Sequence, residues 1–222
     1  MPRARPRLLV AVLVVGALGI TACSKGSATD ATEAKIPIGE LSNLVAKAKT
    51  ARYRVTYHRS GTGTDTMVIA QDPPKYFIAA AGTSVFRTKS TFTECDTLAG
   101  ASSCKHLPSA AALIEQELML SRVFGTTGSL FLYDAPTGIK GLTQLAPADA
   151  TIAGRAARCV TLTGATLTDV DPSATGSFTA CIDARSGVML ESRFVDVDGS
   201  TIDVKAVAYR EPTAADFTPS ST

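Results

Sequence analysis

Alternation of apolar and polar side chains predicts a first group of strands between residues 53 and 92. Tyr53, Val55 and Tyr57 alternate with polar residues, which is the two-residue period of a half-buried strand. Turn-forming Gly and Pro residues then separate three further strands, predicted at 65–71, 75–81 and 84–92. Consecutive strands with such short connections predict an antiparallel meander.

A second group of strands follows in the last third of the chain. The pattern predicts strands at 158–163, 176–183, 188–195 and 201–210. Asp198-Gly199 lies between the last two and is a hairpin signal, because both residue types accept the backbone angles of a tight turn. This part of the chain therefore also predicts antiparallel strand pairs.

A short amphipathic helix is predicted over residues 40–50, before the first strand. Leu41, Leu44, Val45 and Ala48 recur at the spacing of one helix face, and the other face is polar. One side of this helix is expected to pack on the sheet.

A second helix is predicted over residues 108–123. Its segment 118–120 is apolar on more than one face, which is typical of a buried core helix and less often of a lid over an apolar cavity. Residues 124–128 are expected to end the helix, and a short apolar run follows at 130–133. From there to Ala150 the chain is rich in Pro and Gly, and a short helix is the only element expected.

The first 23 residues have the pattern of a bacterial lipoprotein signal peptide. Three arginines precede an apolar run over 8–20, and the small residues Thr21-Ala22 suit a signal peptidase. Ile20-Thr21-Ala22-Cys23 resembles the lipobox, in which a diacylglycerol is joined to the cysteine before cleavage. The run is too short for a transmembrane helix. Ordinary secretory cleavage, which would leave Cys23 as a free thiol, stays open.

Lipidation of Cys23 would divide the chain into three parts. These are a signal peptide over 1–22, a flexible tether over 23–39 and a folded domain over 40–219. The tether is expected to be flexible because its residues are small, polar and without period. The predicted location is the outer face of the cell membrane, held by the lipid anchor.

The charge balance changes when the signal peptide is removed. Residues 1–22 contain three arginines and no acidic residue, so 19 basic and 20 acidic side chains remain. No strongly basic surface is left to bind nucleic acid.

Four cysteines remain beside Cys23, and they permit three pairings. Proximity favours Cys95 with Cys104 across a loop of small residues, and Cys159 with Cys181. The last two have the same phase on neighbouring strands, which suits a cross-strand disulfide. Their spacing is not that of a zinc site, so structural disulfides are expected and no metal.

The chain lacks the sequence motifs of the common catalytic sites. It has two histidines, His58 and His106, and neither has a carboxylate near it in sequence. The hydrolase elbow, the zinc-protease helix motif and phosphate-binding glycine loops are missing. Asp196, Asp198 and Asp203 do not have the spacing of a calcium loop. We therefore expect no enzyme activity and no cofactor.

The last part of the chain resembles a known family. Its motifs are the turn at 182–187, the D-x-D-G hairpin at 196–199 and the tail at 212–219, with Pro73-Pro74-Lys75 before an aromatic strand. Together they resemble LolA-like periplasmic lipoprotein carriers and LppX/LprG-type actinobacterial lipoproteins over residues 38–219. The resemblance implies an α+β fold, in which an unclosed, curved antiparallel sheet wraps around two or more helices. It also implies an apolar cavity that holds acyl chains.

Two functions from different classes follow. The first is a cell-envelope lipoprotein that binds a lipid or other hydrophobic ligand through its inward-facing apolar residues. The second is a membrane-anchored scaffolding module with a filled core, which contacts a protein partner. The residues predicted to line the cavity are Tyr53, Val55, Tyr57, Met67, Ile69, Tyr76, Ile78, Leu190 and Phe194 on strands, with Ile114 and Leu118 on the second helix.

Overall fold

A computed structural model describes residues 36–61, 65–89, 91–98, 101–134, 144–145, 148–164, 167–168 and 171–219. These residues belong to one compact unit, Glu33–Thr222. The signal peptide, the lipidation of Cys23 and most of the tether lie outside the described residues, so they stay predictions.

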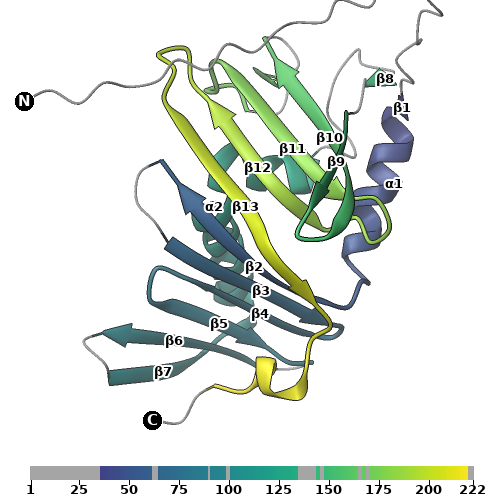
Figure 1. Ribbon diagram of the computed structural model, residues 1–222. Helices are drawn as coiled ribbons and strands as arrows, with labels where there is room; N and C mark the ends of the chain where they lie inside the picture. Colours follow the sequence, from purple (N-terminus) through teal and green to yellow (C-terminus); the bar gives the residue numbers. More distant parts are fainter. Residues whose placement is uncertain are drawn as a thin grey trace, which may run out of the picture. The chain divides into compact units, whose positions relative to one another are not determined.

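The described strands form an eleven-stranded antiparallel sheet (Figure 1). Its strands in chain order are β2 (Tyr53–Ser60), β3 (Asp65–Asp72), β4 (Lys75–Ala80), β5 (Thr83–Arg87), β6 (Phe92–Leu98), β7 (Ala101–Leu107), β9 (Ala148–Ile152), β10 (Arg155–Thr163), β11 (Ser177–Asp183), β12 (Met189–Val195) and β13 (Thr201–Arg210). Each meander predicted from the sequence forms one half of the sheet, here named the β2–β7 half and the β9–β13 half. β2 pairs with β13, so the first and last strands of the chain's two meanders join the halves.

The sheet is not closed, and β7 and β9 are its edges. A separate two-stranded pair is formed by β1 (Ile36–Pro37) and β8 (Gln144–Leu145). The predicted fold class, an unclosed antiparallel sheet around helices, is confirmed.

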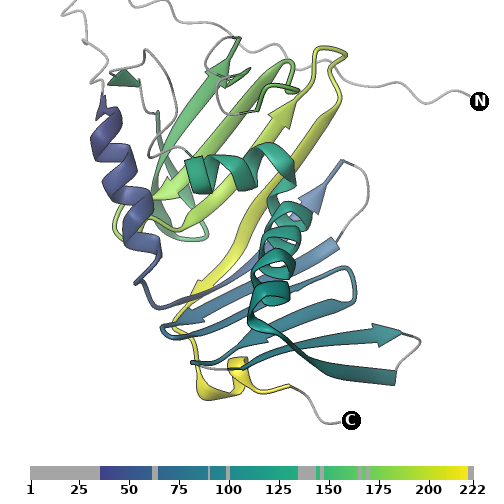
Figure 2. The same ribbon diagram turned by 180° about the vertical axis from the view of Figure 1, so that it is seen from behind.

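Both described α-helices lie on the same face of the sheet, here named the inner face (Figure 2). α1 (Ile38–Ala48) corresponds to the first predicted helix and begins two residues earlier. α2 (Ser109–Asp134) is longer than predicted and has one non-helical residue, Gly125, with φ 73° and ψ 170°. The expected break is therefore a kink, because glycine accepts this positive φ and the helix resumes after it.

Three predicted boundaries are wrong. The strand expected at 84–92 is two strands, because Thr88 and Thr91 form a turn in which the Thr88 amide donates to the Thr91 carbonyl at 2.9 Å. The loop expected between Cys95 and Cys104 is a hairpin, since β6 and β7 pair through it in register. A strand, β9, also lies at 148–152, where only a short helix was expected before Ala150.

The turn at 182–187 is built around the buried carboxylate of Asp183, which is 1% exposed. Arg155 donates to it from Nε at 2.7 Å and Nη2 at 3.2 Å, and the Ser186 amide donates at 2.7 Å. Gly187 follows with φ 75°, and a Cβ there would overlap the Leu44 carbonyl oxygen of α1. The motif thus lets a tight turn contact α1 directly.

The tail motif is held by a second carboxylate, that of Asp216. It accepts hydrogen bonds from Arg54 Nε at 2.9 Å, Arg210 Nη2 at 2.7 Å and the Thr213 amide at 2.7 Å. The next residue, Phe217 in η1 (Ala214–Phe217), is buried beneath the Lys75 ammonium, 5.8 Å from the ring centroid. These contacts fix the tail against β2, β4 and β13.

Candidate functional site

An inner cavity of about 150 Å³ lies between the two helices and the inner face of the sheet. Its walls come from α1, α2, the neighbouring strands β2, β3 and β4, and the start of β12. The described residues that line it are Val45, Ala48, Lys49, Tyr53, Tyr57, Ile69, Gln71, Tyr76, Gln116, Leu120, Phe124, Leu132, Val188 and Met189.

Four residues predicted as cavity lining do line this cavity: Tyr53, Tyr57, Ile69 and Tyr76. All four lie on the inner face, because alternate residues of a strand point to the same side of a sheet. The alternation that predicted the strands therefore also identified which side chains face the helices.

Another four predicted residues are buried but lie outside the cavity lining. Val55, Met67, Ile78 and Leu190 are at most 2% exposed and belong to the packed core. Each has the inward phase that the pattern predicted, and neighbouring side chains fill the space around it.

The inward placement predicted for Leu118 is wrong, since this side chain is 46% exposed. Met119 and Val123 are fully buried instead, so they set the inner side of α2 and turn Leu118 toward solvent. Phe194 is half-buried and lines a different hollow of about 280 Å³ beside the Gly125 kink. The side chain of Ile114 lies outside the described part of the chain.

The lining residues that the sequence analysis missed come from the helices, β3 and the start of β12. Val45 and Ala48 lie on the apolar face predicted for α1, so their signal was present. Gln71 and Gln116 had no such signal in the sequence, because a polar side chain at an inward position cannot be distinguished from a surface residue until its neighbours are known.

Two tyrosine hydroxyls in the cavity differ in their hydrogen bonding. Tyr57 donates to the Met189 carbonyl at 2.7 Å, and its ring contacts Phe124 edge-on with centroids 5.2 Å apart. The Tyr53 side chain is only 8% exposed, yet its hydroxyl has no hydrogen-bond partner among the described residues. Burial raises the pKa of both hydroxyls above the usual value of tyrosine, so both stay protonated and able to donate.

The charge of the described lining comes from Lys49 alone, and no acidic side chain accompanies it. Lys49 is exposed and makes no ion pair with a described residue. Gln71 donates to the Ala48 carbonyl at 2.6 Å and the Ala51 carbonyl at 2.9 Å, which holds the end of α1 against β3. The cavity is therefore apolar with a polar, positively charged rim.

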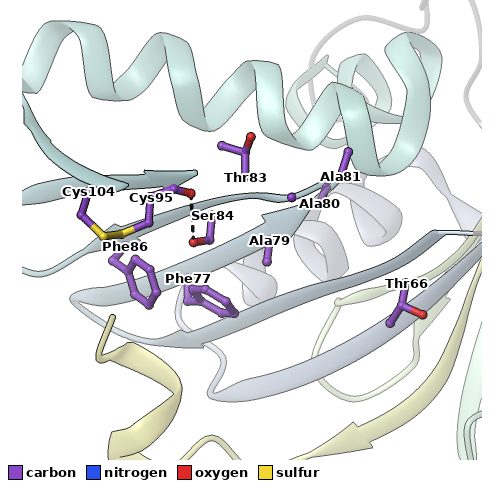
Figure 3. A pocket seen from close by; sticks show the side chains of 11 residues that line it. Thr66, Phe77, Ala79, Ala80, Ala81, Thr83, Ser84, Phe86, Cys95 and Cys104 are labelled. Carbon is purple, nitrogen blue, oxygen red and sulfur yellow. Dashed lines mark hydrogen bonds between the residues drawn. A yellow bond between two sulfur atoms is a disulfide. The ribbon is translucent and has the colours of Figure 1, made fainter. Parts of the chain in front are cut away.

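A second hollow, of about 270 Å³, lies on the outer face of the sheet (Figure 3). Figure 3 shows Phe77, Phe86 and the Cys95–Cys104 disulfide on the side away from α2, and the two rings lie 4.7 Å apart. This hollow is larger than the inner cavity, but it is not covered by the described helices. We take the inner cavity as the candidate site because it lies between two layers of the fold and its lining is mainly apolar.

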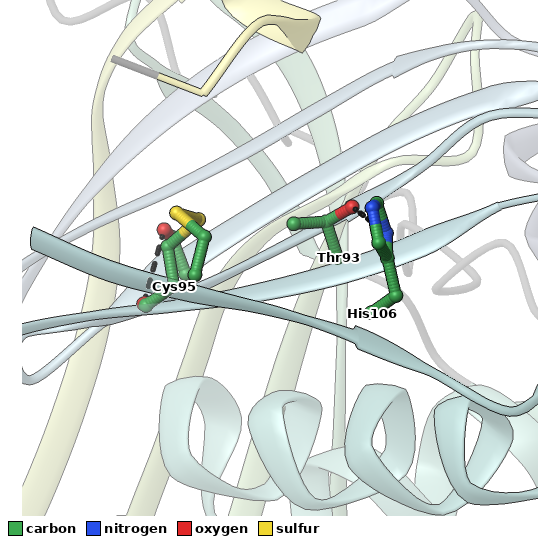
Figure 4. Close-up of a disulfide and its surroundings, with 5 residues drawn as sticks. Thr93, Cys95 and His106 are labelled. Carbon is green, nitrogen blue, oxygen red and sulfur yellow. Dashed lines mark hydrogen bonds between the residues drawn. A yellow bond between two sulfur atoms is a disulfide. The ribbon is translucent and has the colours of Figure 1, made fainter. Parts of the chain in front are cut away.

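Both predicted disulfides are present, and each joins directly opposed residues of neighbouring strands. Cys95 bonds Cys104 across β6 and β7, and Cys159 bonds Cys181 across β10 and β11. Near the first, Thr93 Oγ1 and His106 Nδ1 are hydrogen-bonded at 3.1 Å (Figure 4). His106 is thus an exposed residue of an edge strand.

The described residues contain no cluster of three or more His, Cys, Asp or Glu side chains that could hold a metal ion. Within the same part of the chain, neither helix is both long and apolar enough to cross a lipid bilayer.

Comparison by sequence finds no match, either to a protein-family model or to a curated protein. Comparison by structure finds a chain of the MucA/MucB complex from Pseudomonas aeruginosa, with a TM-score of 0.53, 13% identity and coverage of 82% of this chain and 61% of that chain. A crystal structure of MucB matches with a TM-score of 0.50, 16% identity and coverage of 82% and 62%. This chain thus spans less than two thirds of the MucB chains.

The lipoprotein LppX of Mycobacterium tuberculosis also matches, with a TM-score of 0.41, 13% identity and coverage of 79% of this chain and 96% of that chain. Identities this low concern the fold alone. That fold, an open antiparallel sheet with helices on its inner face, is the one implied by the resemblance seen in the sequence. We conclude that the described part of the chain is an open antiparallel sheet with helices on one face, a fold that it shares with MucB.

Proposed function

We propose that this protein binds a lipid or another hydrophobic ligand through an acyl chain in the inner cavity. The observation that carries the proposal is an open, mainly apolar cavity between the helices and the sheet, with tyrosine and glutamine side chains in its lining. Ligand sites in proteins are typically concave, mostly apolar and furnished with a few polar groups. No covalent chemistry is required for such binding.

The size of the cavity limits what it holds without a change of shape. A dry apolar cavity of about 150 Å³ accommodates a group the size of benzene, which has about six carbon atoms. Each buried methylene contributes about 0.8 kcal/mol, so even part of one chain gives useful affinity. A longer chain would extend through the mouth or require α2 to move away from the sheet.

The proposed setting is the outer face of the cell membrane, with the domain attached through a lipid on Cys23. The supporting observation is the arginine-rich start, apolar run and small residues that precede this cysteine. Cys23→Ala should move the protein from the membrane fraction to the soluble fraction. Retention of this variant in the membrane would contradict the lipid anchor.

Two tryptophan substitutions test ligand binding. Ile69 lines the cavity, so Ile69→Trp should fill it and abolish uptake of a fluorescent fatty-acyl compound while the circular dichroism spectrum stays rich in strand. Val55 is fully buried outside the lining, so Val55→Trp should instead cost about 1–3 kcal/mol of stability through overpacking. This pair separates blocking of the cavity from general damage to the core.

The alternative is a scaffolding module, and the outer hollow at Phe77 and Phe86 favours it. MucB, which shares the fold, has been solved in complex with MucA. If the wild type never takes up the acyl compound and Ile69→Trp only lowers stability, the cavity has no ligand and the scaffolding function stands.

A further inference from the structure

The mouth of the inner cavity carries a positive charge that acyl-chain binding alone does not require. Lys49 is exposed at the end of α1 and lines the cavity, and no acidic residue of the described lining opposes it. The lysine ammonium is a compact, strongly hydrated charge. A negatively charged ligand oxygen can replace part of its hydration shell, and a neutral apolar group cannot. The rim therefore discriminates between ligands by charge.

The Tyr53 hydroxyl provides a second and independent indication. More than nine tenths of this side chain is buried in the cavity wall, and its hydroxyl is unpartnered among the described residues. The hydroxyl oxygen itself is not fully buried, so it is open to the cavity, and a ligand that offers an acceptor oxygen at this point gains a hydrogen bond. Tyr53 begins β2 and Lys49 directly follows α1, so only three residues of chain lie between them.

The carbonyl end of α1 would by itself disfavour a negative ligand, because the carboxyl terminus of a helix carries a partial negative charge. Gln71 offsets this effect, since its amide nitrogen binds the carbonyls of Ala48 and Ala51 at 2.6 and 2.9 Å. Arg87 adds positive charge nearby. Its guanidinium lies 5.4 Å from the Tyr76 ring centroid and donates to Gln116 Oε1 at 3.2 Å, so it contacts two lining residues.

We propose that the ligand of the inner cavity is a single-chain amphiphile with an anionic oxygen headgroup, a carboxylate or a phosphate, held at the mouth by Lys49 and Tyr53. The inference rests on the proposed function and specifies its ligand class. One chain is specified because the cavity accommodates only about six carbon atoms. The headgroup stays in water beside Lys49, and the first part of the chain lies between Tyr53, Ile69 and Leu120. Carbon atoms beyond about the sixth require α2 to move away from the sheet.

The test compares ligands with the same chain and different headgroups. Displacement of the neutral dye N-phenyl-1-naphthylamine from the purified protein reports the affinities of dodecanoate, dodecyl phosphate, dodecanol and dodecylammonium. The two anions should bind about fivefold more tightly than dodecanol, and dodecylammonium more weakly than dodecanol. Salt at about 0.5 M should reduce the preference, because the rim is exposed and screened.

Substitutions at the rim identify the groups responsible. Lys49→Gln should lower the affinity for both anions about fivefold and leave dodecanol unchanged. Lys47→Gln is the matched control, because Lys47 lies exposed in the last turn of α1, two residues before Lys49 and outside the lining, and should change neither. Tyr53→Phe removes only the hydroxyl and should lower the affinity for the anions about threefold, while dye binding is retained.

The outcomes distinguish the anionic headgroup from the acyl-chain binding on which it rests. If the dye and all four amphiphiles bind without a headgroup preference, or if Lys49→Gln and Lys47→Gln behave alike, the anionic headgroup is refuted and the acyl-binding function stands. If neither the dye nor any amphiphile binds, the proposed function fails and this inference fails with it. Preference for dodecanoate alone or for dodecyl phosphate alone would identify which headgroup the mouth selects.

Discussion

The two halves of the sheet present different inner faces to the helices. In the β9–β13 half, Leu162, Phe178, Ile182 and Leu190 are fully buried, and Phe178 contacts Phe131 of α2 with ring centroids 5.5 Å apart. In the β2–β7 half, space remains beside three tyrosines. Toward the β7 edge the inner face of this half becomes polar, since Glu94 there is paired with Lys105 at 3.1 Å.

This difference separates stability from ligand binding. Close packing of large apolar side chains supplies most of the folding free energy, and a cavity reduces it. A protein that keeps a cavity therefore needs a well-packed region elsewhere. The β9–β13 half has that role around Leu162 and Ile182, although it also borders the hollow at Phe194. The inner cavity lies mainly on the other half, with Val188 and Met189 from the start of β12 on one side.

Truncation of core residues should give the largest difference between the halves. Leu162→Ala should cost about 4 kcal/mol, because this fully buried side chain lies outside the hollows described above and leaves a void that its neighbours cannot fill. Leu120→Ala should cost only about 2 kcal/mol, since Leu120 already borders empty space. Urea unfolding of both variants measures the difference. Equal losses would mean that the two inner faces are equally well packed.

Removal of each disulfide should show a smaller difference in the same direction. The chain-entropy model gives about 3 kcal/mol for each bond, slightly more for Cys159–Cys181, whose 22-residue separation exceeds the nine of Cys95–Cys104. Strands β6 and β7 also lie at an edge, which can open locally without global unfolding. Replacing both cysteines of a pair with alanine should therefore cost more in the β9–β13 half. A larger loss at the edge would contradict this order.

Acid sensitivity should be the smallest effect, and it should arise in the β9–β13 half. Burial opposes ionisation of Asp183, but the hydrogen bonds from Arg155 and Ser186 together have the larger effect, so the pKa of Asp183 lies below the usual value. A carboxylate whose pKa is lower in the folded state stabilises the fold at pH values above its unfolded-state pKa of about 3.9. This stabilisation is lost as the pH falls through the folded-state pKa. Asp183→Asn should cost about 2 kcal/mol at pH 7 and reduce the loss of stability below about pH 4.

Asp203 provides the control for this pH effect. Burial and the nearby Glu191 raise its pKa, so its charged form weakens the fold and acidification relieves that effect. Asp203→Asn should therefore not reduce the acid sensitivity. Unfolding curves at several pH values measure both variants. If the unfolding free energy of Asp183→Asn falls below about pH 4 as much as that of the wild type, the Asp183 carboxylate is not the source of the acid sensitivity.

Much of the fold could be predicted because its signals are local. The alternation at Tyr53, Val55 and Tyr57 depends only on the period of a strand, and the pairing of Cys159 with Cys181 depends on phase and proximity. The break between β5 and β6 was missed because Thr88 and Thr91 form a turn without Gly or Pro. Threonine also favours strands, so the sequence pattern did not distinguish the two.

The candidate site was predicted only in part, for a different reason. Inward phase is a property of one strand, so Ile69 and Val55 have the same sequence signal. Only the first lines the cavity, since the space beside each depends on side chains from other elements.

The sequence by itself determined most of the strands, the two disulfides, the presence of two helices and the inward residues of those strands, because each follows from short-range periodicity or spacing. It did not identify β7 and β9. The tertiary structure decided that α2 buries Met119 and exposes Leu118, that Lys49 and Gln116 line the same cavity, and where the inner face of the sheet is left unfilled. These features depend on how segments far apart in the chain pack together. A cavity is the volume that such packing leaves empty, so no single stretch of sequence encodes it.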